Sequence, residues 1–249
     1  MSEQAPGEAQ ERGDAYLERH GSRGEIVFNR PQRRNALSGP LVEITHRGIE
    51  QFVADETIEV ILLRGAGGTF CAGADIKAQR EDPPPAWLEG FGDRWAELHG
   101  ALYDCPKPIV GALEGFAVGG GAALALACDV LIVGEDSMLQ LIEVSIGMPA
   151  PVNLVWLDLK FRGLAAELVL SANRYSGRDL VERGLAARAV PDGEVLSAAR
   201  AYADRLAAHP RGSLVAAKQT MRALDGIEHF GDRVKAAQAT WREASGQYI

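Results

Sequence analysis

The stretch LEGFAVGGGAALALACDVLIVG, residues 113–134, is almost wholly apolar and carries three consecutive glycines. Its length suggests a membrane-spanning helix. However, adjacent glycines are poor in a helix interior, and Asp129 at mid-membrane would cost about 2.5–3.5 kcal/mol on insertion scales. The pieces of the stretch instead have the character of a strand, a glycine turn, a helix and another strand. The sequence therefore predicts no membrane span here.

Strands and helices alternate on both sides of this stretch. VILLRGA (60–66) and KPIVGALEG (107–115) are short apolar runs, typical of buried parallel strands. Residues 38–55 have helical spacing, with Ser38 as a possible cap and Pro40 suited to the first turn. The alternation predicts an α/β fold with right-handed crossovers and a parallel sheet. From about Gly163 onward the pattern is mostly helical.

Composition narrows the class of protein. A chain of 249 residues can form one large α/β domain, and a formal net charge of −8 without basic tracts argues against nucleic acid as a partner. The three cysteines have no metal-like spacing and their number is odd, which favours reduced thiols in the cytoplasm. The five histidines show no metal spacing either. Residues 1–14 are polar, and we expect a disordered tail rather than a signal peptide.

The glycines fit neither of two common phosphate-binding loops. A P-loop needs Gly-Lys-Ser/Thr, which is absent, and the runs GAGGTF from Gly65 and GGGAAL from Gly119 both fail the G-x-G-x-x-G pattern. A strand-to-helix turn with backbone N–H groups facing a ligand remains, and the partial positive charge of the helix N-terminus would suit an oxyanion there. Close packing between helix and strand is the alternative.

Two motifs in a fixed order now indicate a family. FCAGADIK (70–77), followed by GFAVGGGAALALACDV (115–130), resembles the enoyl-CoA hydratase/isomerase, or crotonase, superfamily. The similarity continues through NRPQRRNALS, KPIVGALEG and SGRDLVERGLAARAVP. The resemblance implies a spiral core of ββα units over residues 15–190 that binds acyl-CoA. It also implies a helical region over residues 191–249 that assembles the chain into a homotrimer or a dimer of trimers.

The resemblance implies an oxyanion site made of backbone groups. The N–H groups of Ala74 and Gly120 match the two donors that hold the thioester oxygen as it becomes an enolate. Gly73 and Gly119, which precede them, are expected to line the same binding site.

Local positive charge and aromatic side chains complete the implied site. CoA carries phosphates, and the family-like cations are Arg33, Arg34 and Lys77, although ordinary surface charge would explain them as well. Three aromatic residues match positions that often line the acyl pocket in this family: Trp87, Phe91 and Trp95. Packing in the core is the alternative role for them.

One of the family's two hydratase glutamates is missing. The first position, in a pattern like GGGxE, is Ala123 here, and the second, in a pattern like PEIxxG, is Glu143. Hydration uses two carboxylates to hold and deprotonate a water, whereas moving a double bond needs one base. The pattern therefore predicts an isomerase that converts 3-enoyl-CoA to 2-enoyl-CoA. A hydratase that works with Glu143 alone, other enolate chemistry and a non-catalytic CoA-binding assembly protein are the alternatives.

The surroundings of Glu143 favour its role as a base. It lies in the mostly apolar run MLQLIEVSIGMPAP, where desolvation raises the pKa of a carboxyl group, although a structural carboxylate at a strand end is possible. Asp129 and Asp75 are expected to be hydrogen-bonding structural acids, and Cys71 a packed side chain. No metal is expected, and no cofactor other than the CoA of the substrate.

Overall fold

The computed structural model describes residues 13–210, 212–226 and 229–248. The first twelve residues of the predicted tail lie outside this range.

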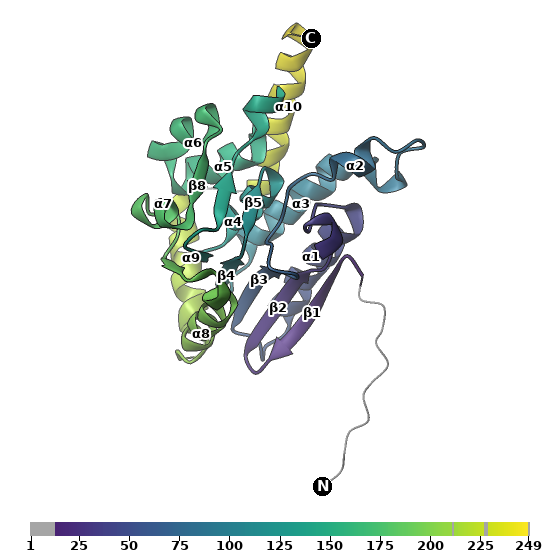
Figure 1. Ribbon diagram of the computed structural model, residues 1–249. Coiled ribbons are helices and arrows are strands. Elements are labelled where there is room, and N and C mark those ends of the chain that lie inside the picture. Colours follow the sequence, from purple (N-terminus) through teal and green to yellow (C-terminus); the bar gives the residue numbers. More distant parts are fainter. Residues whose placement is uncertain (1–12, 211, 227–228, 249) are drawn as a thin grey trace.

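A six-stranded sheet forms the base of the fold (Figure 1). Its strands, in spatial order, are β1 (Ala15–His20), β2 (Arg23–Phe28), β3 (Val60–Gly65), β4 (Ile109–Leu113), β6 (Val130–Gly134) and β9 (Arg188–Val190). The first two form an antiparallel hairpin, and every later neighbour pairs in parallel. The predicted parallel sheet is therefore confirmed.

A second, three-stranded sheet carries the candidate site. It consists of β5 (Phe116–Val118), β7 (Met138–Gln140) and β8 (Arg174–Ser176). The first two strands run parallel, and β8 pairs antiparallel to β7. The chain steps from the large sheet to the small one between Leu113 and Phe116, and it enters the glycine turn directly after β5.

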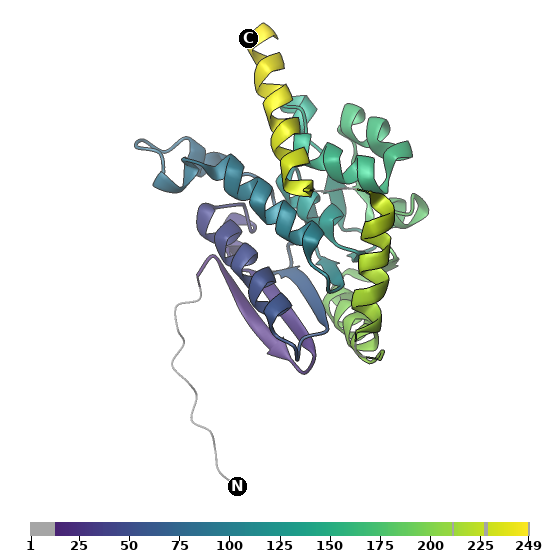
Figure 2. The same ribbon diagram turned by 180° about the vertical axis from the view of Figure 1, so that it is seen from behind.

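Helices cover both faces of the large sheet, which explains the continuous apolar runs of its strands. Alternate residues of β3 point to opposite faces: Ile61 and Leu63 belong to the main core, whereas Val60 and Leu62 face helix α8 (Val195–Ala207). Helices α1 (Gly39–Ala54) and α3 (Phe91–Asp104) lie on the main-core side, as Figure 2 shows. The predicted helix over 38–55 is confirmed as α1, and Ser38 caps it, since its hydroxyl accepts a hydrogen bond from Leu41 N–H.

The remaining helices are α2 (Ile76–Gln79), α4 (Gly120–Ala127), α5 (Pro151–Lys160), α6 (Ala165–Ser171), α7 (Gly177–Glu182), α9 (Ser213–Asp225) and α10 (Phe230–Tyr248). Short 3-10 turns cover Pro31–Arg33, Ala86–Leu88, Glu143–Ile146, Arg162–Leu164 and Asp192–Glu194. The last helix packs on α3 and α5: the Phe230 ring stacks on Tyr103 with centroids 4.6 Å apart and lies 4.3 Å from the Trp156 ring.

Two local features differ from the sequence patterns. The sequence from Trp87 to Tyr103 has helical spacing, but the long helix begins only at Phe91, directly after Gly90, where φ is 65°. The mostly helical stretch after Gly163 also contains the strands β8 and β9. They form because they pair with β7 and β6, and a strand of three residues is too short to show a periodic pattern in the sequence. The prediction for the opening stretch is confirmed: it forms the end of β4, then β5, α4 and β6, and none of the described helices is long and apolar enough to cross a bilayer.

Candidate active site

Three short parallel segments bring the candidate residues together. Cys71 pairs in parallel with Ala117 of β5, and β5 in turn pairs with β7. Ala74, Gly120 and Glu143 each follow within three residues of the end of one of these segments. Since carboxyl ends of parallel strands meet at one edge, the three residues line a single cavity, a common place for ligands in α/β folds.

The loop that carries Ala74 and the turn that carries Gly120 approach each other closely at Gly73. A Cβ atom on Gly73, where φ is 82°, would lie 2.5 Å from the Val118 carbonyl oxygen and 3.4 Å from Gly120 N. Gly120 opens α4, and the first N–H groups of a helix have no intrahelical acceptor. Within the described chain, neither Ala74 N–H nor Gly120 N–H donates to a protein acceptor. Both groups therefore remain available to a ligand oxygen.

Gly119 lets the turn approach the carboxylate. Its φ is 53°, its N–H donates to the Gln140 carbonyl at 2.9 Å, and a Cβ there would lie 3.4 Å from Glu143 Oε1. A side chain at this position would be strained and would crowd the carboxylate.

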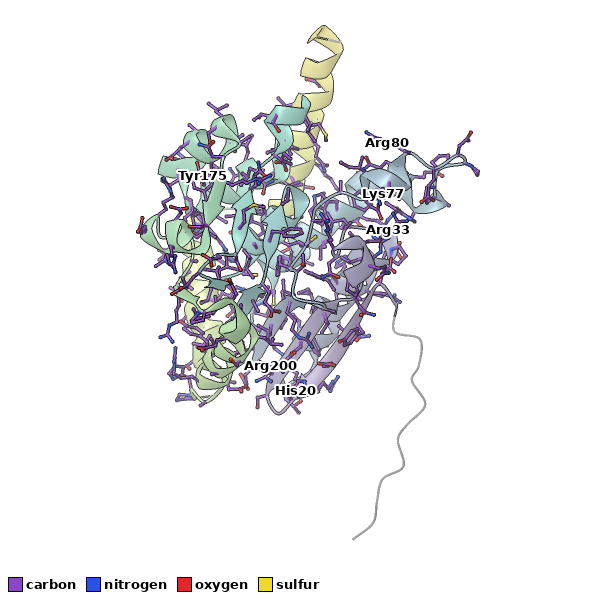
Figure 3. All side chains as sticks on the ribbon, viewed as in Figure 1. His20, Arg33, Lys77, Arg80, Tyr175 and Arg200 are labelled. Carbon is purple, nitrogen blue, oxygen red and sulfur yellow. The ribbon has the colours of Figure 1, made fainter. Side chains whose placement is uncertain are left out.

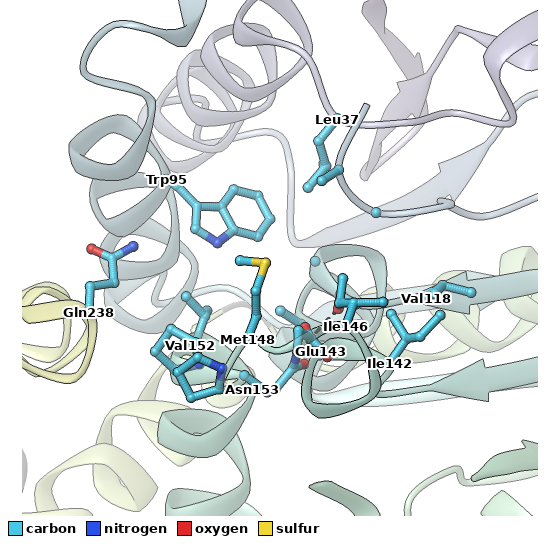
Figure 4. Close-up of a pocket in the computed structure, with 18 of the residues that line it drawn as sticks. Leu37, Trp95, Val118, Ile142, Glu143, Ile146, Met148, Val152, Asn153 and Gln238 are labelled. Atoms are coloured by element: carbon cyan, nitrogen blue, oxygen red, sulfur yellow. Dashed lines mark hydrogen bonds between the residues drawn. The ribbon is translucent and has the colours of Figure 1, made fainter. Parts of the chain in front are cut away.

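Glu143 opens a 3-10 turn directly after the strand region and points into the cavity (Figure 4). Its Oε1 accepts a hydrogen bond from Asn153 Nδ2 at 2.7 Å. Its Oε2 is buried and has no partner among the described residues. Burial raises the pKa of this carboxyl group above its ordinary value, and the hydrogen bond from Asn153 offsets that only in part. The free oxygen thus has the character of a proton acceptor.

The cavity holds about 480 Å³ and is largely apolar. Glu143 is the one ionisable side chain among the lining residues of the described chain, and Asn153 and Gln238 supply the other polar side chains. Ala123 presents a fully buried methyl group at the position of the missing second glutamate. The apolar lining includes Leu37, Phe91, Trp95, Val118, Ile142 and Met148.

Two of the three predicted aromatic residues wall this cavity. Phe91 and Trp95 line it, whereas Trp87 packs against the Phe91 ring from outside, with centroids 5.6 Å apart. Behind Trp95 lies fully buried His99, whose Nδ1 accepts from Trp156 Nε1 at 2.8 Å. Burial lowers the pKa of His99 to about 3, so this ring stays neutral.

The predicted CoA-binding cations gather next to the oxyanion loop. Arg33, Arg34 and Lys77 line a second cavity of about 410 Å³, and Ala74 borders both cavities. Arg33 and Lys77 lie close together in Figure 3. Arg33 Nη1 is 3.9 Å from Asp75 Oδ1, so part of its charge is compensated. The structure thus joins the predicted cations to the predicted thioester site.

The structure gives hydrogen-bond partners to Asp129 and Asp75 and buries Cys71, in line with the structural roles expected of them. Asp129 Oδ2 accepts from Ile109 N–H at 2.8 Å and from Lys218 Nζ at 2.6 Å. Asp75 accepts from Ala78 N–H and from Arg30. Cys71 is fully buried, and burial raises the pKa of its thiol to about 12, which suppresses the nucleophilic thiolate.

One group of potential metal ligands occurs among the described residues, away from this cavity. The ligand atoms of Glu18, His20 and Glu25 lie within 4.8 Å of one another. However, the Glu25 carboxylate accepts hydrogen bonds from Arg23, Arg64 and Arg200. Three guanidinium groups around one carboxylate neutralise it and disfavour a cation, so this cluster is an ion-pair network.

Asn153 and Gln238 were not among the predicted site residues. Asn153 lies in the first turn of α5, and Gln238 comes from α10, far along the chain. A polar residue within the apolar run PVNLVW was the only sequence signal for Asn153, and no signal in the sequence pointed to Gln238.

Comparisons with known proteins agree with this geometry. The 2,3-dehydroadipyl-CoA hydratase of Escherichia coli is 32% identical over 199 residues, which are 79% of this chain and 77% of that protein. The mouse protein named enoyl-CoA hydratase domain-containing protein 2, mitochondrial, is 36% identical over 178 residues, 70% of this chain and 60% of its own. The crystal structure of an enoyl-CoA hydratase from Bacillus anthracis matches with a TM-score of 0.78 at 26% identity, covering 91% of this chain and 90% of that one.

The family description enoyl-CoA hydratase/isomerase matches residues 18–239. This range contains both cavities and nearly all of the described chain. The crotonase-like fold expected from the two motifs is thereby confirmed. The protein belongs to the enoyl-CoA hydratase/isomerase family.

Proposed function

We propose that this enzyme moves the double bond of a 3-enoyl-CoA to the 2-position. The observation that supports the proposal most directly is the lone carboxylate. Glu143 shares one cavity with the two backbone donors, and with Ala123 at the other glutamate position no second acid lines this cavity among the described residues. One base and one oxyanion site are sufficient for this reaction.

The reaction starts when Glu143 Oε2 removes a proton from C2 of the thioester. The electron pair of that C–H bond delocalises into the thioester carbonyl, and the N–H groups of Ala74 and Gly120 stabilise the negative oxygen. The same carboxylic acid then returns the proton to C4, and the double bond settles between C2 and C3. The apolar walls exclude water, which would otherwise compete for the proton and weaken both hydrogen bonds.

CoA recognition is assigned to the neighbouring basic cavity. Arg33, Arg34 and Lys77 share this cavity with Ala74, and in the proposal they bind the phosphate groups while the thioester reaches past Ala74. The proposed reaction transfers no electrons and needs no cofactor beyond the CoA of the substrate. The apolar cavity favours an uncharged acyl group, because none of the described residues that line it has a cationic side chain to receive a carboxylate on the acyl chain.

Hydration of a 2-enoyl-CoA is the second candidate, favoured by the names of the relatives from E. coli and B. anthracis. In that reaction Glu143 would activate a water alone. With Ala123 in place of a second acid, the water lacks one of the two carboxylates that would hydrogen-bond it, so we expect hydration to be the slower reaction.

Parallel assays of both reactions test the proposal. Wild type should isomerise 3-enoyl-CoA faster than it hydrates 2-enoyl-CoA, and Glu143→Gln should lose about 10²–10⁴-fold of the isomerase rate, the usual contribution of a general acid–base group. Ala123→Glu should raise the rate of hydration, because it adds a second carboxylate that can hydrogen-bond the water. Full activity of Glu143→Gln would reject the site, and rapid hydration with little isomerisation by wild type would reject the ranking.

We further propose that the chain works as a trimer or a pair of trimers in the cytoplasm. Helix α9 exposes Met221 and Leu224, which are 56% and 82% accessible and share one face of the helix. Large apolar side chains with this exposure are typical of surfaces that a partner covers.

A further inference from the structure

Asn153 connects the carboxylate of Glu143 to the glycine turn. Its Nδ2 donates to Glu143 Oε1 at 2.7 Å and to the Gly119 carbonyl oxygen at 3.2 Å. The side chain is 1% exposed and comes from the first turn of α5, which packs against α4. One amide therefore ties the base to the turn that carries the oxyanion donor.

The orientation of this amide follows from its neighbours. A carboxylate and a backbone carbonyl only accept hydrogen bonds, so the group between them must be the donating NH₂. Glu143 Oε1 is thereby occupied, whereas Oε2 is buried and unpartnered. The two oxygens of the carboxylate are unequal before any substrate arrives.

We propose that Asn153 is a positioning residue that holds Glu143 by Oε1 and leaves Oε2 as the atom that carries the proton. The proposal rests on the single-base function given above. A lone base has to accept the proton from C2 and deliver it to C4 from the same oxygen atom, without a rotation that exchanges the two oxygens of the carboxyl group. The C2–H bond breaks as an Oε2–H bond forms, and the C4–H bond forms as that Oε2–H bond breaks. The hydrogen bond from Nδ2 to Oε1 persists throughout.

No other ionisable group shares this task among the described residues that line the cavity. The β5–α4 turn presents Gly119 and Gly120 to Glu143, α3 presents Trp95, and α5 presents Asn153. The pKa of Glu143 is raised by burial and lowered by its own backbone and by Asn153, with no contribution from a charged neighbour. Changes at Asn153 therefore report on the carboxylate directly.

Two substitutions of similar bulk separate positioning from packing. Asn153→Leu removes the donor without adding charge, and Asn153→Asp replaces it with a like charge. In both variants we expect kcat to fall about 10- to 100-fold, the range for losing one hydrogen bond to a charged group, with KM unchanged. The acidic limb of the pH–rate profile should move to higher pH in the Leu variant and further in the Asp variant, because a second carboxylate raises the pKa of the first.

Leu154→Ala is the matched control, since Leu154 is the next residue of α5, is 38% exposed and does not line the cavity. Thermal melting and calorimetry with acetoacetyl-CoA show whether each variant is folded and binds thioester. A folded Leu variant with the wild-type kcat and acidic limb overturns the proposal. If the Leu variant does not fold, an Asp variant with an unmoved limb overturns it instead.

The outcome is separable from that of the proposed function. If wild type hydrates and does not isomerise, the isomerase proposal fails, and the same pH profiles are then measured on hydration. The limb still reports the ionisation of Glu143, so a shift supports the role of Asn153 and an unchanged limb rejects it.

Discussion

At the scale of single residues, Glu143 shows that a buried base lowers the stability of the folded protein. Its carboxylate is buried with one oxygen unpartnered, and burial raises its pKa. The folded protein therefore binds this proton more tightly than the unfolded chain does, so the ionised group destabilises the fold. The same desolvation that makes Glu143 a better base reduces stability at neutral pH.

A neutral side chain of the same shape should therefore stabilise the fold. We expect Glu143→Gln to melt at a higher temperature than wild type at pH 8, where the native carboxyl group is ionised. The gap should close as the pH falls below the pKa of an ordinary glutamate, because both chains are then neutral at this position. Melting curves at several pH values measure it, with the exposed Glu182→Gln as control. A lower melting temperature for the variant at pH 8 would contradict this account.

Much of the site could be predicted from the order of motifs along the chain. The resemblance pointed to Ala74, Gly120 and Glu143, and the structure brings all three together in the lining of one cavity. The partner of the base was not predictable, because Asn153 reaches Glu143 through a contact between a 3-10 turn and the start of a helix that has no periodic signature. Side-chain hydrogen bonds of this kind depend on packing that the sequence does not display.

At the scale of elements, α8 is fastened to the large sheet by a buried carboxylate. Glu25 on β2 accepts from Arg64 on β3 at 2.7 Å and from Arg200 on α8 at 2.8 Å. Figure 3 shows Arg200 beside the end of the sheet. Burial alone would raise the pKa of Glu25, but the hydrogen bonds from Arg200 and Arg64 outweigh it and lower the pKa to about 2. This ion-pair network stabilises the packing of α8.

Removing this carboxylate should loosen α8 more than any other element. We expect Glu25→Gln to lower the free energy of unfolding by about 3–5 kcal/mol, the usual cost of breaking a buried pair. In wild type the contribution is present above the pKa of an ordinary glutamate and is lost as the pH falls toward about 2. Urea unfolding at pH 7 checks the magnitude, with Glu182→Gln again as the exposed control. A change below about 0.5 kcal/mol, the range of surface substitutions, would contradict the role.

The elements themselves were predictable in proportion to their length. The long helix α1 and the apolar strand β3 have periodic patterns that span several residues. By contrast, β8 and β9 have three residues each, and they exist because β7 and β6 offer them hydrogen bonds. Pairing partners that are distant in the chain leave no local signal.

At the scale of the whole molecule, the exposed face of α9 predicts assembly. Met221 and Leu224 would be covered in a trimer or a hexamer, and Leu224→Asp should place an unpaired charge in that contact. We expect light scattering to report an oligomer for wild type and a smaller species for Leu224→Asp at micromolar protein. Leu170→Asp is the control on α6, an equally apolar and 74% exposed site away from α9. A wild-type chain that remains a monomer would reject the assembly.

The position of α10 has a consequence for how the protein is made. Phe230 covers Tyr103 and Trp156, and Gln238 borders the cavity, so the pocket includes a helix that is synthesised after α3 and α5. Chains fold from the N-terminus as they emerge from the ribosome. A nascent chain therefore presents the Tyr103 and Trp156 rings to chaperones until Phe230 has been synthesised and α10 has packed on them. Premature termination before Phe230 would leave the same aromatic surface open, a mark by which proteases can distinguish an unfinished chain from a finished enzyme.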